Sequence, residues 1–358
     1  MRKLILRILP IIFPVIVLIL ILNYSVDPAN LFNKEYAKRI AINLNNGYNI
    51  ANVGNYDERE LQKEWINGYK QTPDIIILGS SRSMLINSTL FENQVVKNNS
   101  VSGASLEDYL AIYNCYSEKG MMPKRIIINV DPYLLNANNN QFRWKSIARD
   151  YYKLLNQLYL GEFFQESELV KTELRYRYDK FYEFISFEYF QQSVIDLVMT
   201  GRKNQHSPTH KMKNDKLTKN TDGSIKYDFK TLNRDTNEVN KMAYKQFNSG
   251  SIYSLGEFSE LNEAYCQIFQ TFIAHLKSKK IDITFFYSPY HPLVYSQLKS
   301  DRKYELFFKA ENFYNELANK YEIHIKGTFS PFELNLKSKD FYDGLHCNQT
   351  TIDRLLDN

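Results

Sequence analysis

The sequence predicts an α/β fold in which helices cover both faces of a parallel sheet. Short apolar runs alternate with stretches of helical period, and continuous apolar runs are typical of strands buried on both faces. The strand-like runs are residues 75–78, 94–101, 125–130, 281–287 and 323–327, and the helical stretches are 106–116, 259–277 and 304–321. This alternation indicates a doubly wound sheet. A chain of 358 residues is long enough to build it.

A long segment, residues 135–255, breaks this rhythm. It is rich in Tyr, Phe, Asn and Lys, with helical pieces up to Met199 and a polar stretch to about Tyr244. We interpret it as an insertion into the α/β domain at 73–358, because a long interruption of a compact sheet domain is typically a lid or a binding segment.

The amino end predicts a membrane anchor at residues 1–24, followed by a membrane-proximal segment at 25–72. Arg7 is the only charged residue from position 4 to position 22, and residues 8–22 are wholly apolar, which suits one transmembrane helix. Arg2, Lys3 and Arg7 precede this stretch and Asp27 follows it, so the positive-inside bias places the amino end in the cytoplasm and the body outside it. The alternative is a cleaved signal peptide, but the following residues lack a small-x-small cleavage pattern.

Composition and spacing argue against several function classes. Lys and Arg number 45 against 40 Asp and Glu, a net charge of only +5. Nucleic-acid binding is therefore not expected, and no Gly-rich phosphate loop is present. Cys115, Cys266 and Cys347 match no metal-site spacing, so we expect neither a metal nor another cofactor.

Candidate catalytic residues follow the first two predicted strands. Gly79-Ser80-Ser81 comes after the first, at a predicted strand-to-helix turn, where a serine oxygen suits a nucleophile. The alternative for such a serine is a helix cap. Gly103 follows the second strand, where its N–H can approach a substrate oxygen, although it is equally typical of a turn.

Further candidates follow later strands. Asp343 and His346 lie three residues apart, so the carboxylate can orient an imidazole that takes a serine proton, although Asp-x-x-His is common by chance. Asp131 follows a strand and can orient the first loop. His291, between Pro289 and Pro292, either lines the pocket or is a hydrogen-bonded structural residue.

In combination these blocks resemble the SGNH/GDSL hydrolase superfamily. The resemblance assigns the nucleophile to Ser81, a second oxyanion donor to Gly103, and the final block to Asp343 and His346. Ser80 stands where the family has Asp. The third block departs from the family pattern, because Asp131-Pro132-Tyr133 stands where Gly-x-Asn-Asp is usual, which leaves the side-chain oxyanion donor without a clear counterpart.

The membrane-anchored branch, which includes DltD-like and exopolysaccharide O-acetylation proteins, is the most similar part of the superfamily. The segments at 25–32 and 288–292 also look like that branch, whereas 135–255 does not share the resemblance. The resemblance implies a flavodoxin-like, three-layer SGNH-type sheet. It further implies an extracytoplasmic serine acyltransferase or esterase that acts on O-acyl groups of a cell-envelope polysaccharide or teichoic-acid-type polymer, often beside a multi-spanning MBOAT-type acyltransferase.

The mechanism that follows from this resemblance has His346 deprotonate Ser81, which attacks an ester carbonyl and forms an acyl-serine intermediate. A sugar hydroxyl or water then accepts the acyl group. The sequence does not choose between these acceptors, and only the family branch and the anchor favour transfer. The alternatives are a hydrolytic carbohydrate esterase and a non-catalytic SGNH-like scaffold that binds glycan or a protein partner.

Overall fold

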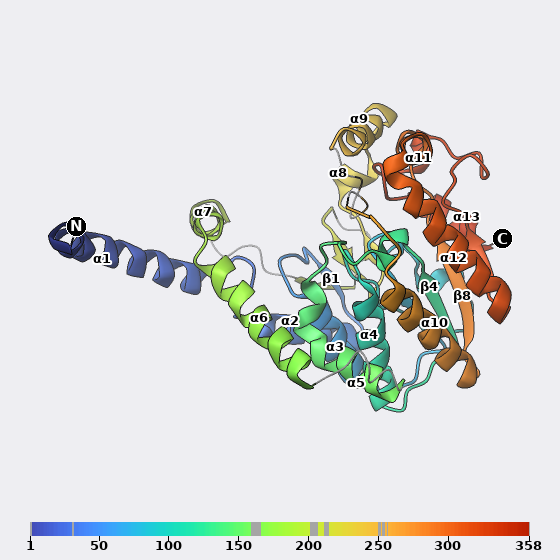
Figure 1. The fold of residues 1–358 in the computed structure, drawn as a ribbon, viewed down its shortest axis with the longest axis horizontal. Coiled ribbons are helices and arrows are strands. Elements are labelled where there is room, and N and C mark those ends of the chain that lie inside the picture. Colours follow the sequence, from blue (N-terminus) through green and yellow to red (C-terminus); the bar gives the residue numbers. More distant parts are fainter. Residues whose placement is uncertain are drawn as a thin grey trace.

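A five-stranded parallel sheet forms the centre of the molecule (Figure 1). The computed structural model describes residues 2–30, 32–158, 166–200, 207–210, 215–249, 252, 255 and 257–357. The strands lie in the order β3-β2-β4-β8-β9, with bounds Val96–Asn98, Ile75–Leu78, Arg125–Asn129, Asp282–Tyr287 and His324–Gly327. Each strand falls within an apolar run that predicted it, so the α/β class and the parallel sheet are confirmed. In chain order this is 2-1-3-4-5, the order of flavodoxin-like sheets.

Both faces of the sheet are buried at its three central strands, β2, β4 and β8, because alternate side chains of these strands enter different cores. Ile76 and Phe285 pack in the larger core, which contains side chains of α4, α10 and α12. Ile77 and Phe286 pack in a smaller core with side chains of α13 and of the turns before it. The bounds of these helices are Leu106–Glu118, Glu263–Ser278, Glu305–Tyr321 and Gln349–Asp357.

The segment before β2 belongs to the same body. It contains α2 (Lys34–Asn45), β1 (Asn49–Ala51) and α3 (Glu58–Asn67). Leu61 and Trp65 of α3 are fully buried in the larger core. The amino end of α3 therefore has a fixed position relative to the sheet, which matters for the site described below.

The segment predicted as an insertion folds into helices and a second, antiparallel sheet that the sequence did not predict. The order of this sheet is β5-β1-β6-β7, so the insertion pairs with β1 of the segment before β2. The bounds of β5, β6 and β7 are Ser207–Thr209, Thr218–Lys219 and Ile225–Lys226, and those of helices α5 to α9 are Ala148–Gln157, Glu166–Phe184, Phe187–Ile195, Phe229–Leu232 and Thr236–Phe247. Helix α11 (Pro292–Ser300) follows β8. The strands are too short to show an alternating pattern.

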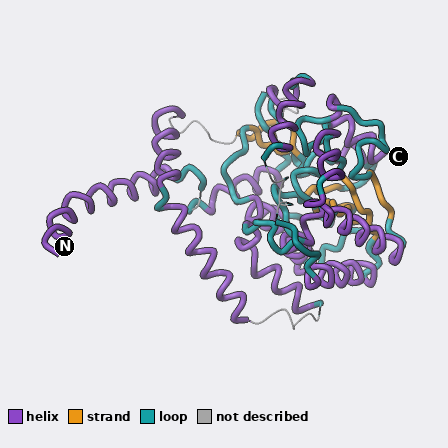
Figure 2. The backbone as a smooth tube through the Cα atoms, turned by 45° about the horizontal axis from the view of Figure 1, so that its top comes forward, coloured by secondary structure: helices purple, strands orange, loops and turns teal. Residues whose placement is uncertain are grey.

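Helix α1 (Arg2–Val26) projects from the body (Figures 1 and 2). Near its end, Asn23 Nδ2 donates to the carbonyl oxygen of Phe184 at the end of α6, 2.8 Å away. Within the described residues, no helix combines the length and apolar character that crossing a lipid bilayer requires. The helix lies where the sequence placed it, but its prediction as a transmembrane segment has no support from the structure.

Candidate active site

Polar residues gather at the carboxyl edge of the parallel sheet. Ser81 follows β2, Gly103 follows β3, Asp131 follows β4, and Asp343 and His346 follow β9. In parallel sheets the carboxyl ends of all strands meet at one edge, where ligands bind. The fold therefore brings together residues that are up to 265 positions apart in the chain.

Ser81, His346 and Asp343 form a continuous chain of hydrogen bonds. Ser81 Oγ lies 2.8 Å from His346 Nε2, and His346 Nδ1 lies 2.9 Å from Asp343 Oδ2. An ionised carboxylate can only accept hydrogen bonds, so the proton of a neutral imidazole must reside on Nδ1. Nε2 is then the acceptor for the Ser81 hydroxyl, which is the arrangement in which a histidine can act as general base toward a serine.

The Asp343 carboxylate is fixed by its own loop. Its Oδ1 accepts from the backbone N–H groups of Leu345 at 2.8 Å and His346 at 3.0 Å. Burial raises the pKa of the Asp343 carboxyl, but the His346 imidazole and these N–H groups outweigh burial and lower it to about 2. Asp343 is therefore ionised at any pH at which the protein is expected to work.

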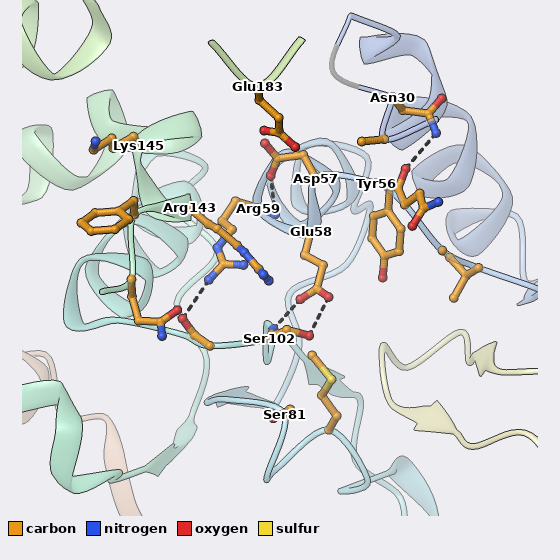
Figure 3. A pocket seen from close by; sticks show the side chains of 18 of the residues that line it. Asn30, Tyr56, Asp57, Glu58, Arg59, Ser81, Ser102, Arg143, Lys145 and Glu183 are labelled. Atoms are coloured by element: carbon orange, nitrogen blue, oxygen red, sulfur yellow. Dashed lines mark hydrogen bonds between the residues drawn. The ribbon is translucent and has the colours of Figure 1, made fainter. Parts of the chain in front are cut away.

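A cavity of about 950 Å³ opens at this site, and Ser81, Gly103 and His346 line it. Figure 3 shows its wall above Ser81, formed by the residues at the amino end of α3. Other lining residues come from the insertion: Arg143, Lys145, Tyr176, Asp179, Lys180 and Glu183. The insertion thus contributes to the cavity wall, which agrees with its interpretation as a lid or binding segment.

Two backbone donors are available in the cavity. Within the described part of the chain, the N–H groups of Ser81 and Gly103 donate to no protein acceptor. Gly103 has φ +56°, a left-handed conformation that a side chain would strain. The amide of Asn129 is the nearest counterpart to the missing third-block side chain, but its Nδ2 donates to the Phe286 carbonyl at 3.2 Å. It therefore does not supply a third donor.

The loop that carries Ser81 is a series of turns, so the expectation that Ser81 stands at the amino end of a helix was wrong. Residues 81–85 form turns rather than a helix. The reason is that carbonyl groups of this loop accept hydrogen bonds from elsewhere. Asn98 Nδ2 donates to Ser83 O at 2.9 Å and Ile86 O at 2.8 Å, and the N–H of Ile225 donates to Met84 O at 2.9 Å. Carbonyls used in this way are not free for helical i→i+4 bonding.

Asp131 lies beneath the Ser81 loop rather than in the cavity. Its Oδ2 accepts from Ser80 Oγ at 2.6 Å, and its Oδ1 accepts from Arg82 Nη1 at 2.6 Å. Both members of the ion pair are almost fully buried. Asp131 thus holds the residues on either side of Ser81, which is the loop-orienting position that the sequence suggested.

Arg82 connects the Ser81 loop to two other strand ends. Its Nε donates to Leu345 O at 3.2 Å, within the loop that carries His346. Its Nη2 donates to the carbonyls of Ser288 and Pro289 after β8, and its guanidinium lies 3.8 Å from the centre of the Tyr290 ring. The side chains of Arg82 and Asp131 together join the loops after β2, β4, β8 and β9.

His291 does not line the cavity. It is fully buried at the start of α11, where Nδ1 accepts from the N–H of Leu293 at 3.2 Å. The backbone N–H of His291 donates to Gly344 O at 3.1 Å. Burial lowers the pKa of the imidazole to about 4, although Asp343 opposes this, so His291 is neutral at neutral pH. Of its two interpretations, the geometry agrees with the structural one.

Sequence reasoning missed the contributions of Glu58, Arg59 and Arg82. Arg82 adjoins the predicted nucleophile, and an arginine in an otherwise small, polar turn was the available signal. Glu58 and Arg59 lie in the first turn of α3, where acidic residues are common for helix stability alone, so nothing marked them. In the described part of the chain, no three His, Cys, Asp or Glu side chains are grouped closely enough to hold a metal ion.

Neither a protein-family model, nor a curated protein, nor a solved structure matches this chain. The functional argument therefore depends on the geometry of the site and on the resemblance of its sequence blocks.

Replacing Asp131 should destabilise the protein strongly. Asp131→Ala leaves the Arg82 guanidinium buried without its carboxylate, which typically costs about 3–5 kcal/mol. The matched control is Asp282→Ala, because the Arg125–Asp282 pair has the same 2.6 Å separation but is partly exposed. The control should lose no more than about 1 kcal/mol. Urea unfolding measures both, and equal losses would contradict the structural role given to Asp131.

The carboxyl of Asp343 should make stability depend on pH. Its pKa is about 2 in the folded protein against an ordinary value of 3.8, so it stabilises the fold by about 2 kcal/mol at neutral pH. Because the folded pKa is the lower one, this stabilisation is present above pH 4 or so and is lost as the pH falls toward 2.

The difference in unfolding free energy between the wild type and Asp343→Asn should therefore be largest near pH 6 and shrink below pH 4. Asp357→Asn, which removes an exposed carboxylate at the end of α13, controls for the general loss of negative charge. A difference that is constant from pH 6 to pH 2.5 would count against the ionised, hydrogen-bonded Asp343.

Proposed function

We propose that this protein is a serine-dependent acyl-transfer enzyme of the SGNH-like kind. The observation that carries the proposal is the hydrogen-bonded chain from Ser81 through His346 to Asp343, placed in a cavity at the carboxyl edge of a parallel sheet. Acyl transfer of this kind requires a serine, a histidine whose Nε2 lone pair accepts from the serine hydroxyl, and a carboxylate that orients the histidine. A scaffold without catalytic activity would have no use for this alignment.

The first half of the reaction forms the acyl-serine. His346 Nε2 takes the proton of Ser81 as Oγ attacks the ester carbonyl of the donor. The N–H groups of Ser81 and Gly103 stabilise the negative charge that develops on the carbonyl oxygen. The ester C–O bond then breaks, and the departing alcohol takes the proton from His346. Asp343 stays ionised throughout and stabilises the imidazolium.

The second half transfers the acyl group. His346 takes a proton from an incoming hydroxyl, whose oxygen attacks the acyl-serine carbonyl. The bond between the acyl carbon and Ser81 Oγ then breaks, and Oγ takes the proton back from His346. We propose that this hydroxyl belongs to a cell-envelope polysaccharide or teichoic-acid-type polymer and that an MBOAT-type membrane acyltransferase supplies the acyl donor. The sequence resemblance supports these assignments. A cavity of about 950 Å³ is large enough for a segment of such a polymer. If water is the acceptor, the same site is a carbohydrate esterase.

Serine-directed labelling tests the catalytic proposal. A fluorophosphonate should modify Ser81 of the wild type, and Ser81→Ala should abolish labelling and lower the release of p-nitrophenol from p-nitrophenyl acetate by about 10⁴-fold. Ser117→Ala, in α4 and away from the site, is the matched control and should behave as the wild type. If the wild type remains unlabelled, the scaffold alternative is correct.

The same assay separates transfer from hydrolysis. When a glycan is added, an acyltransferase should place the acetyl group on the glycan, which mass spectrometry detects, whereas an esterase should yield acetate alone.

We further propose that α1 attaches the protein to the cell membrane, with the body on the extracytoplasmic side. The support comes from the sequence, in which residues 8–22 of this helix are wholly apolar. The charge asymmetry around the helix supports the orientation.

After alkaline carbonate extraction, the full chain should remain with the membranes, whereas residues 28–358 expressed with a cleavable export signal should be released. In intact cells whose outer surface is exposed to protease, the body of the full chain should be digested. Release of the full chain by carbonate would contradict the anchor, and protection of its body would contradict the orientation.

A further inference from the structure

The amino end of α3 holds the two peptide units on either side of the one that carries the Gly103 N–H. We propose that Glu58, with Arg59, is a positioning residue for the oxyanion donor, an inference that rests on the acyl-transfer function proposed above. Neither residue belongs to the sequence blocks that suggested the function. Their contribution is visible only in the folded protein (Figure 3).

Glu58 holds the residue before Gly103. Its carboxylate accepts two hydrogen bonds from Ser102, one from the backbone N–H and one from Oγ at 2.8 Å. Two bonds from one carboxylate to one residue fix both its backbone and its side chain. Glu58, Ser102 and Gly103 all line the cavity. Glu58 thus lies in the cavity wall, and both of its carboxylate oxygens accept hydrogen bonds from Ser102.

Arg59 holds the peptide unit that follows Gly103. Its Nη2 donates to Gly103 O at 3.2 Å. The guanidinium is itself fixed by Asp108 through bonds of 3.0 Å from Nε and 2.8 Å from Nη2, and both side chains are buried. The Ser102–Gly103 peptide therefore lies between two hydrogen-bonded neighbours whose partners are consecutive residues of α3.

This arrangement leaves the Gly103 N–H as a donor with a fixed direction. The N–H of Ser102 and the carbonyl of Gly103 belong to the peptide units before and after the one that carries the Gly103 N–H, and both are occupied. Because each peptide unit is planar, the Gly103 N–H can change direction only if ψ of Ser102 and φ of Gly103 change together between these two held units. An oxyanion donor is effective when it is already aimed at the place where negative charge develops. Glu58 and Arg59 fix this direction from α3, outside the loop that contains Gly103.

The insertion holds the same end of α3. Asp57, the N-cap of α3, accepts from Ser146 Oγ at 3.1 Å and from the Tyr176 hydroxyl at 3.2 Å. Tyr176 belongs to α6 and also lines the cavity. The wall that contacts substrate and the residues that aim the oxyanion donor are therefore parts of one connected structure.

The test compares Glu58→Ala and Glu58→Gln in the full chain, with Glu64→Ala on the same helix as the control. The readouts are the two constants for reaction with a fluorophosphonate, kinact and KI, and the melting temperature. Glu58→Ala should lower kinact by about 10- to 100-fold, with KI unchanged and a melting temperature close to that of the control. Glu58→Gln should retain most of kinact, because its amide oxygen can accept from Ser102 N–H while its NH₂ group donates to Oγ.

A wild-type kinact in Glu58→Ala would overturn the inference and leave the proposed function intact. A Glu58→Gln variant as slow as Glu58→Ala would also overturn it, because the negative charge, not the hydrogen bonds, would then be the active property. If Glu58→Ala does not fold, Ser102→Ala serves instead: it removes the Oγ bond alone and should lower kinact several-fold, whereas an unchanged kinact would overturn the inference. A wild type that is never labelled at Ser81 would overturn the proposed function and this inference together.

Discussion

The buried ion pair between Arg82 and Asp131 is the interaction on which the site depends. Loops that follow different strands have no backbone ladder to fix their relative positions, because the ladder ends where the strands end. The guanidinium of Arg82 supplies that connection, since a planar group with five donors can bond several carbonyls at once. It contacts the loops after β4, β8 and β9, and Arg82 itself directly follows Ser81 in the chain. Burying this ion pair away from water costs free energy. The hydrogen bonds that Arg82 and Asp131 make with each other and with the loops offset that cost.

The Ser81–His346 distance therefore follows from contacts beneath the cavity rather than within it. Arg82 bonds the carbonyl of Leu345, the residue before His346, so the nucleophile and the base are joined through a buried side chain as well as through their own hydrogen bond. His291 adds a second connection, because its backbone N–H donates to the carbonyl of Gly344 in the same loop. Residues outside the cavity thus fix the distance between Ser81 Oγ and the His346 imidazole.

The sequence predicted those parts of the structure that leave a local pattern. The strands β2, β4 and β8 are apolar, and β9 falls within the predicted run at 323–327. These positions placed Ser81 and His346 at one edge of the sheet. The small antiparallel sheet could not be predicted, because its two- and three-residue strands have no periodicity and β1 pairs with β5 and β6 across more than 150 residues. The turn structure after Ser81 was missed for a similar reason: Asn98, on a different strand, takes the carbonyls that a helix would have used.

In the acyl-transfer site proposed above, both oxyanion donors are backbone N–H groups, and this accounts for the many supporting contacts. Where a side-chain amide helps to form an oxyanion pocket, one donor can be aimed by its own rotamer. Here the amide of Asn129 is committed to Phe286, and the two remaining donors are backbone N–H groups, whose direction depends entirely on how their peptides are held. Two separate groups of side chains do this: Asp131 and Arg82 hold the Ser81 loop, and Glu58 and Arg59 hold the Gly103 turn. A pocket of this kind is expected to be sensitive to substitutions that lie outside every recognisable motif, because the motif residues supply the chemistry and the surrounding residues supply the geometry.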